Sequence, residues 1–262
     1  MSKFIEKYSN NDIGRDFILS DLHGCYEDLI NKLTEVNFDY KKDRVFSVGD
    51  LCDRGPHSGK CLQLVYEDWF IPVFGNHEWL WARAHDEFYK LGLFGVGPLV
   101  GRFADYQIFI SNGGEIIDPS DNFTMKDLKE LVKTIISLPR AIELETKSGG
   151  RVGIIHAELP FSDWEQLYDA NEFNFLDDNW QDWEEHILWG RSMCMYKPDE
   201  KTDYTIKNID RVYAGHTIVP EVKTVANRVY IETGCFWKYK HPHFTEEKKK
   251  QGFLADLTLL EV

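Results

Sequence analysis

Three short apolar segments of this chain each end at a polar, glycine-containing motif, and a helical pattern follows each motif. The apolar segments are residues 17–19, 45–48 and 71–74. After the first motif, Leu29 and Leu33 recur at the spacing of one helix face. Repeated strand–motif–helix units predict an α/β fold with a mostly parallel sheet. The carboxyl ends of its strands then meet at one edge, where such sheets bind their ligands.

The motifs are rich in carboxylates, imidazoles and glycine. They are Ser-Asp-Leu-His-Gly at 20–24, Gly-Asp-Leu-Cys-Asp-Arg-Gly at 49–55 and Gly-Asn-His-Glu at 75–78. Two later apolar segments, 152–155 and 211–214, end at His156 and His216. Glycine lets the backbone turn sharply and approach a bound ion closely. We therefore expect these strand ends to bring their polar side chains together.

The rest of the chain is compatible with one domain spanning residues 1–262. A helical insert is expected at about 79–150, with a glycine-rich loop at 91–101 and a helix at 125–138 that Pro139 ends. Further strands are expected at 222–225, 228–232 and 253–261. Internal repeats and low-complexity tracts are absent from the sequence, so no linker divides the chain.

The charge balance narrows the class of partner. The chain carries 30 basic and 44 acidic side chains, a net charge of −14. An acidic surface argues against nucleic acid or an anionic membrane as the main partner, although bound metals can still attract a phosphorylated ligand.

The five cysteines form no CxxC pair, as is typical of reduced thiols. The sequence has no signal segment and no stretch of roughly 18 apolar residues, so we expect a soluble cytoplasmic protein.

Six motif side chains form a candidate ligand set for two divalent metal ions: Asp21, His23, Asp50, Asn76, His156 and His216. Asp50 can give one oxygen to each ion, with Asp21 and His23 on the first ion and the others on the second. This mixed oxygen and nitrogen set suits manganese, iron, zinc or nickel better than magnesium or calcium. Two ions roughly 3.5–4 Å apart would clamp a phosphate ester and hold a bridging hydroxide for direct attack on phosphorus.

Three further motif residues, together with Arg191, match the remaining steps of phosphate-ester hydrolysis. His77 can protonate the leaving alkoxide as a general acid, and Asp53 can hold its ring in the correct tautomer. Arg54 and Arg191 offer planar guanidinium groups that suit phosphoryl oxygens. We predict that these residues complete a catalytic site for phosphomonoester hydrolysis.

These motifs resemble the phosphoprotein phosphatase branch of the calcineurin-like metallophosphoesterases, and within it the bacterial and lambda-phage type of serine/threonine protein phosphatase. The likeness rests on residues 21–29, 49–58, 75–78, 156–157, 188–191, 214–217 and 232–235. It implies a four-layer sandwich of two packed mixed β-sheets flanked by helices, and the metal, acid and phosphate-binding roles given above. It also implies manganese as the activating ion and a phosphorylated protein or small phosphoester as substrate. The chain departs from the family pattern at three positions. Glu232 stands where aspartate is usual before Thr-Gly, Ser20 stands where glycine is usual, and Cys52 stands where valine is common.

Two alternative functions remain open from the sequence. A symmetrical bis(5'-nucleosyl)-tetraphosphate hydrolase belongs to a sister family, which typically lacks the aspartate at the position of Asp53 and has aspartate at that of Glu78. A non-catalytic metal-binding interaction module would need the ligands, but it gives no reason to keep Asp53 and His77.

The segment 161–186 has nine acidic residues and no lysine or arginine. It is either a docking rim for basic peptides or a solvated surface helix.

Overall fold

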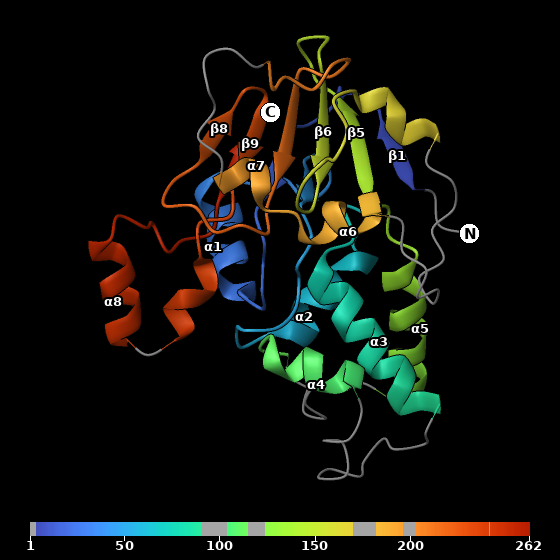
Figure 1. The fold of residues 1–262 in the computed structure, drawn as a ribbon, viewed down its shortest axis with the longest axis vertical. Coiled ribbons are helices and arrows are strands. Elements are labelled where there is room, and N and C mark those ends of the chain that lie inside the picture. The colour runs from blue at the N-terminus through green and yellow to red at the C-terminus, as the bar shows by residue number, and fades with distance from the viewer. Residues whose placement is uncertain (1–3, 91–103, 115–123, 170–181, 196–202, 241) are drawn as a thin grey trace.

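The computed structural model describes residues 4–90, 104–114, 124–169, 182–195, 203–240 and 242–262 (Figure 1). Its strands form two sheets, which occupy the upper half of Figure 1, and helices α2 to α5 fill the lower half. The smaller sheet has the order β10–β2–β3–β4. Its strands are β2 (Asp16–Leu19), β3 (Arg44–Ser47), β4 (Phe70–Pro72) and β10 (Leu259–Glu261). The first three are parallel and β10 is antiparallel to β2, which confirms the predicted parallel units.

The larger sheet is mixed and has six strands in the order β1–β5–β6–β7–β9–β8. They are β1 (Ile5–Tyr8), β5 (Ala141–Glu145), β6 (Arg151–Ile155), β7 (Arg211–Ala214), β8 (Lys223–Val225) and β9 (Arg228–Tyr230). The central strands β6, β7 and β9 are parallel to one another, and β1 is parallel to β5. Strand β5 runs antiparallel to β6, and β8 runs antiparallel to β9. Because β6 and β7 are parallel neighbours, their carboxyl ends lie side by side.

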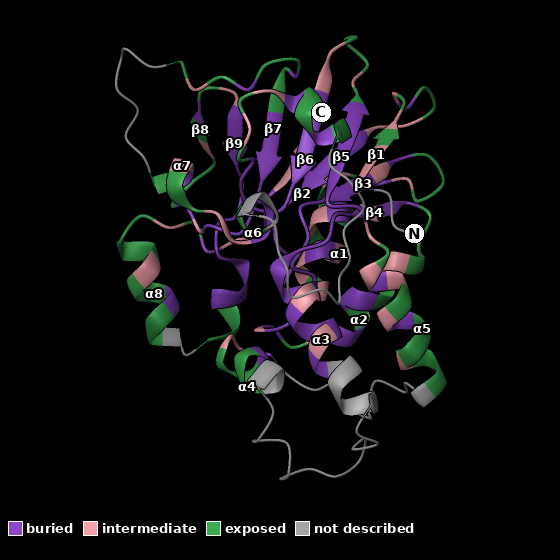
Figure 2. Ribbon diagram, turned by 45° about the vertical axis from the view of Figure 1, so that its right-hand side comes forward, coloured by how far each residue is buried: buried purple, intermediate pink, exposed green. Residues whose placement is uncertain are grey.

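The two sheets pack against each other through a shared apolar layer. Ile18 and Phe46 of the smaller sheet, with Val73 just after β4, enter one buried cluster together with Ile154 and Tyr213 of the larger sheet. Figure 2 shows the strands of both sheets largely in purple, the colour of buried residues. Burial on both faces explains why these strands read as continuous apolar runs. With helices on the outer faces, the arrangement is the predicted four-layer α/β sandwich.

The first three helices begin at or just after the three polar motifs, and the others lie elsewhere in the chain. The helices are α1 (Tyr26–Glu35), α2 (Ser58–Gln63), α3 (Asn76–Lys90), α4 (Ala104–Ser111), α5 (Met125–Ile136), α6 (Asp182–Trp189), α7 (Ser192–Met195) and α8 (Pro242–Lys250). Helix α3 packs against α4 and α5. Helix α5 begins with a capping box, in which the Thr124 side chain and Asp127 exchange hydrogen bonds with each other's backbone amides. The sequence predicted this helix over 125–138, and the structure ends it at Ile136.

Several element predictions need correction. Strands β1 and β5 were not predicted, and β5 falls within the 79–150 segment expected to be helical. The strand expected at 253–261 is limited to β10, because Ala255 has a left-handed backbone (φ 51°) that interrupts extended structure. Helix α8 was also not predicted. The loop expected at 91–101 lies outside the described residues.

None of the helices in the described part of the chain combines the length and apolar character needed to cross a membrane.

Candidate metal centre

The motif side chains converge where the carboxyl ends of five strands meet. Strands β2, β3 and β4 of the smaller sheet lead to Asp21, Asp50 and Asn76, and β6 and β7 of the larger sheet lead to His156 and His216. All these side chains are buried. Both sheets therefore contribute to one site, although the residues are distant in sequence.

The backbone at this edge is strained. A left-handed φ, which residues other than glycine seldom adopt, occurs at His23 (42°), Asp50 (50°), Asp53 (70°), Arg54 (71°) and His216 (61°). Such conformations cost free energy and persist only where surrounding contacts impose them, commonly at functional sites. The strain places five predicted site residues in turns that direct their side chains toward a common centre.

One half of the centre consists of Asn76, His156 and His216. The Asn76 Oδ1 lies 2.7 Å from His156 Nε2 and 2.9 Å from His216 Nδ1, and these two ring nitrogens are 3.2 Å apart. The His156 Nδ1 is 2.8 Å from the carbonyl oxygen of Val48 and can donate to it. The Nε2 lone pair then faces the Asn76 oxygen, another acceptor, and a cation between them would satisfy both.

The other half consists of Asp21 and His23. The His23 Nε2 lies 3.5 Å from Asp50 Oδ2 and 3.9 Å from Asp21 Oδ2. The His23 Nδ1 is 3.0 Å from the carbonyl oxygen of Cys52, which fixes the ring as in the other half. The His216 amide donates to both oxygens of Asp21, at 2.9 and 3.1 Å. A Cβ at Gly215 would lie 1.8 Å from Asp21 Oδ1, so only glycine allows this approach.

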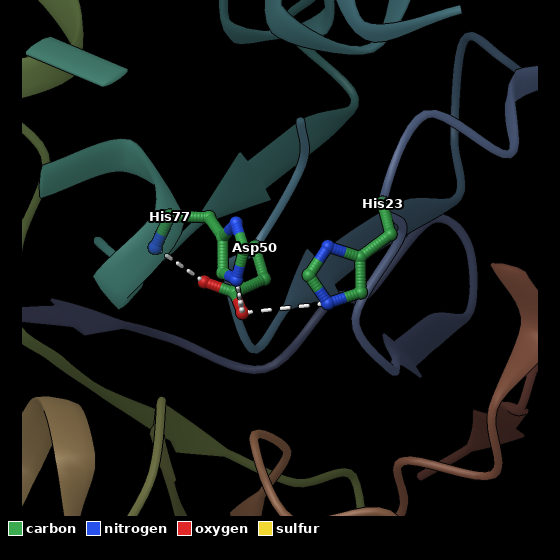
Figure 3. Close-up of side chains that lie close together, drawn as sticks. All are labelled: His23, Asp50 and His77. Atoms are coloured by element: carbon green, nitrogen blue, oxygen red, sulfur yellow. Dashed lines mark hydrogen bonds and ion pairs between the residues drawn. The ribbon is translucent and has the colours of Figure 1, made fainter. Parts of the chain in front are cut away.

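Asp50 lies between the two halves. Figure 3 shows its contacts with His23 and His77. Its Oδ2 faces His23, and its Oδ1 lies 3.4 Å from His156 Nε2. The His77 amide also donates to Oδ1 at 2.9 Å. Each carboxylate oxygen thus faces a different half, which is the geometry a shared ligand needs.

His77 forms a buried pair with Asp53. The His77 Nδ1 is 2.7 Å from Asp53 Oδ2, while its Nε2 has no hydrogen-bond partner within the described residues. That Nε2 also lies 4.0 Å from Asp50 Oδ2, so His23, Asp50 and His77 form a possible three-ligand group. The geometry permits His77 either to carry a proton toward the centre or to bind a cation.

Glu78 is a structural residue of the site that sequence reasoning did not assign. It is fully buried, and its carboxylate accepts hydrogen bonds from the amides of Asp50 (2.8 Å), Leu51 (2.7 Å) and Gly75 (2.9 Å). It therefore joins the turns after β3 and β4. The available sequence signal was an acid at the end of the 75–78 motif, next to the predicted general acid His77 and near the predicted ligand Asn76.

The two predicted phosphate-binding arginines lie in different surroundings. Arg54 is partly buried, donates from Nη1 to His23 Nε2 at 2.7 Å, and its guanidinium lies 4.9 Å from the centre of the Phe236 ring. Arg191 is exposed and donates from Nη1 to the carbonyl oxygen of His216 at 3.1 Å. Both guanidinium groups thus contact candidate ligand residues.

Glu158 holds the short helix that follows Arg191. Its carboxylate accepts from the Ser192 hydroxyl (2.8 Å) and from the Met193 and Cys194 amides. Because Glu158 follows His156 by two residues, the end of β6 is connected directly to the segment that carries Arg191. The acidic segment 161–186 is described only in part, since residues 170–181 lie outside the described residues.

The electrostatics of the site favour bound cations. Burial lowers the pKa of His23, His156 and His216, that of His216 to about 2, so all three imidazoles are neutral ligands near pH 7. Burial, with the charge of Glu232, raises the pKa of Asp21. Several buried carboxylates surrounded by neutral imidazoles need positive charge, which two divalent ions would supply. The residues present therefore fit a dimetal centre.

Comparison with known proteins gives the family. The model of the calcineurin-like phosphoesterases matches residues 17–220, so the chain belongs to this family of metallophosphoesterases, which use a dimetal centre. The serine/threonine-protein phosphatase 2 of Salmonella typhimurium is 32% identical over 228 residues, which cover 87% of this chain and 91% of that protein.

Two further similarities are informative. The symmetrical bis(5'-nucleosyl)-tetraphosphatase of Wigglesworthia glossinidia brevipalpis is 40% identical, but only over 65 residues, 24% of each chain. Among solved structures, a protein serine/threonine phosphatase from Saccharomyces cerevisiae aligns with a TM-score of 0.55 at 15% identity, covering 88% of this chain and 71% of that one. This structural likeness concerns the fold alone.

Proposed function

We propose that this phosphoesterase is a metal-dependent phosphomonoesterase of the protein serine/threonine phosphatase type, with manganese as its activating ion. The observation that supports it most strongly is the position of Asp50, whose two oxygens face the two ligand groups separately. The two cations, when bound, would activate water for direct attack on phosphorus and draw charge from the phosphoryl oxygens.

The residues of the chain divide into three roles in this proposal. Asp21, His23 and Asp50 would bind one cation, and Asp50, Asn76, His156 and His216 the other. Arg54 and Arg191 would bind the phosphoryl oxygens with paired guanidinium donors. Arg54 is partly buried and Arg191 is exposed, so both lie at the border of the buried ligands, where a surface-bound substrate can reach them.

His77 would protonate the leaving oxygen. Its ring is oriented by Asp53 at 2.7 Å, and its Nε2 has no acceptor in the described structure, which leaves that atom available for the substrate. The interaction-module alternative gives Asp53 no role, and it would use His77 only as a metal ligand.

The tetraphosphatase function is the second candidate, and the extent of similarity favours the phosphatase. The likeness to the Salmonella phosphatase covers most of both chains, whereas the likeness to the tetraphosphatase covers about a quarter. Asp53 and Glu78 also have definite structural partners, His77 for the first and three backbone amides for the second.

One assay tests the proposal against both alternatives. Metal-free protein is given Mn²⁺ and then offered a serine-phosphorylated peptide, an aryl phosphate and a dinucleoside tetraphosphate. We expect turnover of the first two, with a higher kcat/KM than for the third. Preference for the tetraphosphate would support the second candidate, and no turnover of any substrate would support a non-catalytic role.

A further inference from the structure

Glu232, which follows β9, has a carboxylate oxygen that the fold does not account for. The residue is only 1% exposed. Its Oε1 accepts a hydrogen bond from the Gly234 amide at 2.7 Å, whereas its Oε2 is buried and receives no hydrogen bond from any residue that the structure describes. A buried carboxylate oxygen without a partner costs free energy, so its retention needs an explanation.

Glu232 has two carboxylates and one arginine among its charged neighbours. The Glu232 carboxylate lies close enough to Asp21 to act on it electrostatically, which places it beside the Asp21 side chain. Asp21 and Asp50 are like-charged neighbours, and Arg54 is an attractive one. The Nη1 of Arg54, however, donates to His23 Nε2 at 2.7 Å. Three buried carboxyl groups therefore lie next to one partly exposed arginine, and burial raises the pKa of both Glu232 and Asp21.

We propose that Glu232 Oε2 is a further ligand for the cation held by Asp21, His23 and Asp50. This inference rests on the proposed dimetal centre. In that centre the second cation has four protein ligands and the first has three, so Glu232 makes the two sets equal. A carboxylate oxygen is a hard ligand, which suits Mn²⁺. The ligand would attract the cation, and the cation would neutralise the buried oxygen.

A purely structural role is the competing explanation. Through Oε1, Glu232 supports the turn at Gly234, whose φ is 82°. The substitution Glu232→Gln separates the two roles, because glutamine keeps a side-chain oxygen for the Gly234 amide and loses the negative charge. Glu232→Asp keeps the charge but shortens the side chain by one methylene group.

The test measures metal binding without substrate. Metal-free wild-type protein and variants are titrated with Mn²⁺ by calorimetry, with free Mn²⁺ followed by electron paramagnetic resonance. Asp21→Asn marks the site of the first cation and His216→Gln that of the second. We expect Glu232→Gln to weaken binding roughly 10–100-fold at the site that Asp21→Asn weakens. The site that His216→Gln weakens should be unchanged, and Glu232→Asp should give an intermediate loss at the first site.

Thermal unfolding in a chelator completes the test. Metal-free Glu232→Gln should melt no lower than metal-free wild type, because it loses a like-charge repulsion and keeps the Gly234 hydrogen bond. Wild-type affinity at both sites of Glu232→Gln would overturn the assignment. So would a lower melting temperature without metal together with equal weakening of both sites. A wild-type protein that binds fewer than two Mn²⁺ ions would instead refute the metal centre itself and this ligand with it.

Discussion

The metal centre and the segment around Arg191 adjoin each other but are built differently. In the centre the candidate ligands are buried, and His23, His156 and Asp21 each have a second contact that fixes their orientation. Around Arg191 the side chains of Arg191, Ser192 and Met195 are exposed, and the last two belong to the four-residue helix α7 that follows Arg191. If the proposed function holds, the chemistry depends on a rigid buried network, whereas substrate contact depends on a few surface groups held by Glu158.

The largest effect is expected inside the centre. His77→Asn should lower kcat roughly two to four orders of magnitude on substrates with poor leaving groups, because the proton donor is lost. Steady-state kinetics on alkyl and aryl phosphates measures it, and aryl phosphates should suffer less. Mn²⁺ binding should stay intact. Loss of a cation from this variant would show that His77 is a ligand and contradict the acid assignment.

Removal of the metal ions should lower the stability of the folded protein, because the free energy of cation binding at the centre is lost. Cations that bind only the folded state at about 100 times their Kd stabilise it by roughly 2.7 kcal/mol. We therefore expect a chelator to lower the melting temperature of the wild type, as scanning calorimetry can measure. Arg191→Ala should show the same drop, since its side chain is outside the ligand set. An unchanged melting temperature in wild-type protein would argue against metal in the folded core.

Arg191→Ala should act on substrate affinity. Loss of a charge-assisted contact to phosphate costs about 1.5–3 kcal/mol, and exposure to solvent reduces that figure toward about 1 kcal/mol. KM for a phosphopeptide and the inhibition constant for inorganic phosphate should both rise roughly tenfold or less. Arg191→Lys is the matched control, because it keeps the charge without the planar fork. Full activity of both variants would remove Arg191 from the site.

The smallest effect is expected for Glu158→Gln. The neutral side chain still accepts hydrogen bonds from the Ser192, Met193 and Cys194 groups, but more weakly. We expect the hydrogen bonds that hold the Arg191 segment to weaken by about 0.3–1 kcal/mol in total. This would raise KM roughly two- to fivefold and leave kcat and metal binding unchanged. The same kinetic assay measures it. A fall in kcat without a change in KM would place Glu158 in the chemistry instead.

Much of the fold followed from local pattern, and the errors have a common cause. The motif-bearing strands were predicted because each is a short apolar run that stops at glycine-containing polar sequence. Strand β1 is polar and partly exposed, and β5 follows a helix closely, so neither gives that signal. Helix α8 has a weak apolar face and three lysines in its last turn, a pattern that also fits a loop.

The sequence by itself determined which residue types are available for the chemistry, because aspartate, asparagine and histidine follow apolar strands at fixed spacings. Only the tertiary structure decided which of them meet. Packing of the two sheets brings His156 and His216 to Asn76 and Asp50, and it places Glu78 under three backbone amides and Glu232 beside Asp21. The physical reason is that motifs report local backbone geometry, whereas the partner of a buried carboxylate is set by contacts between segments far apart in the chain.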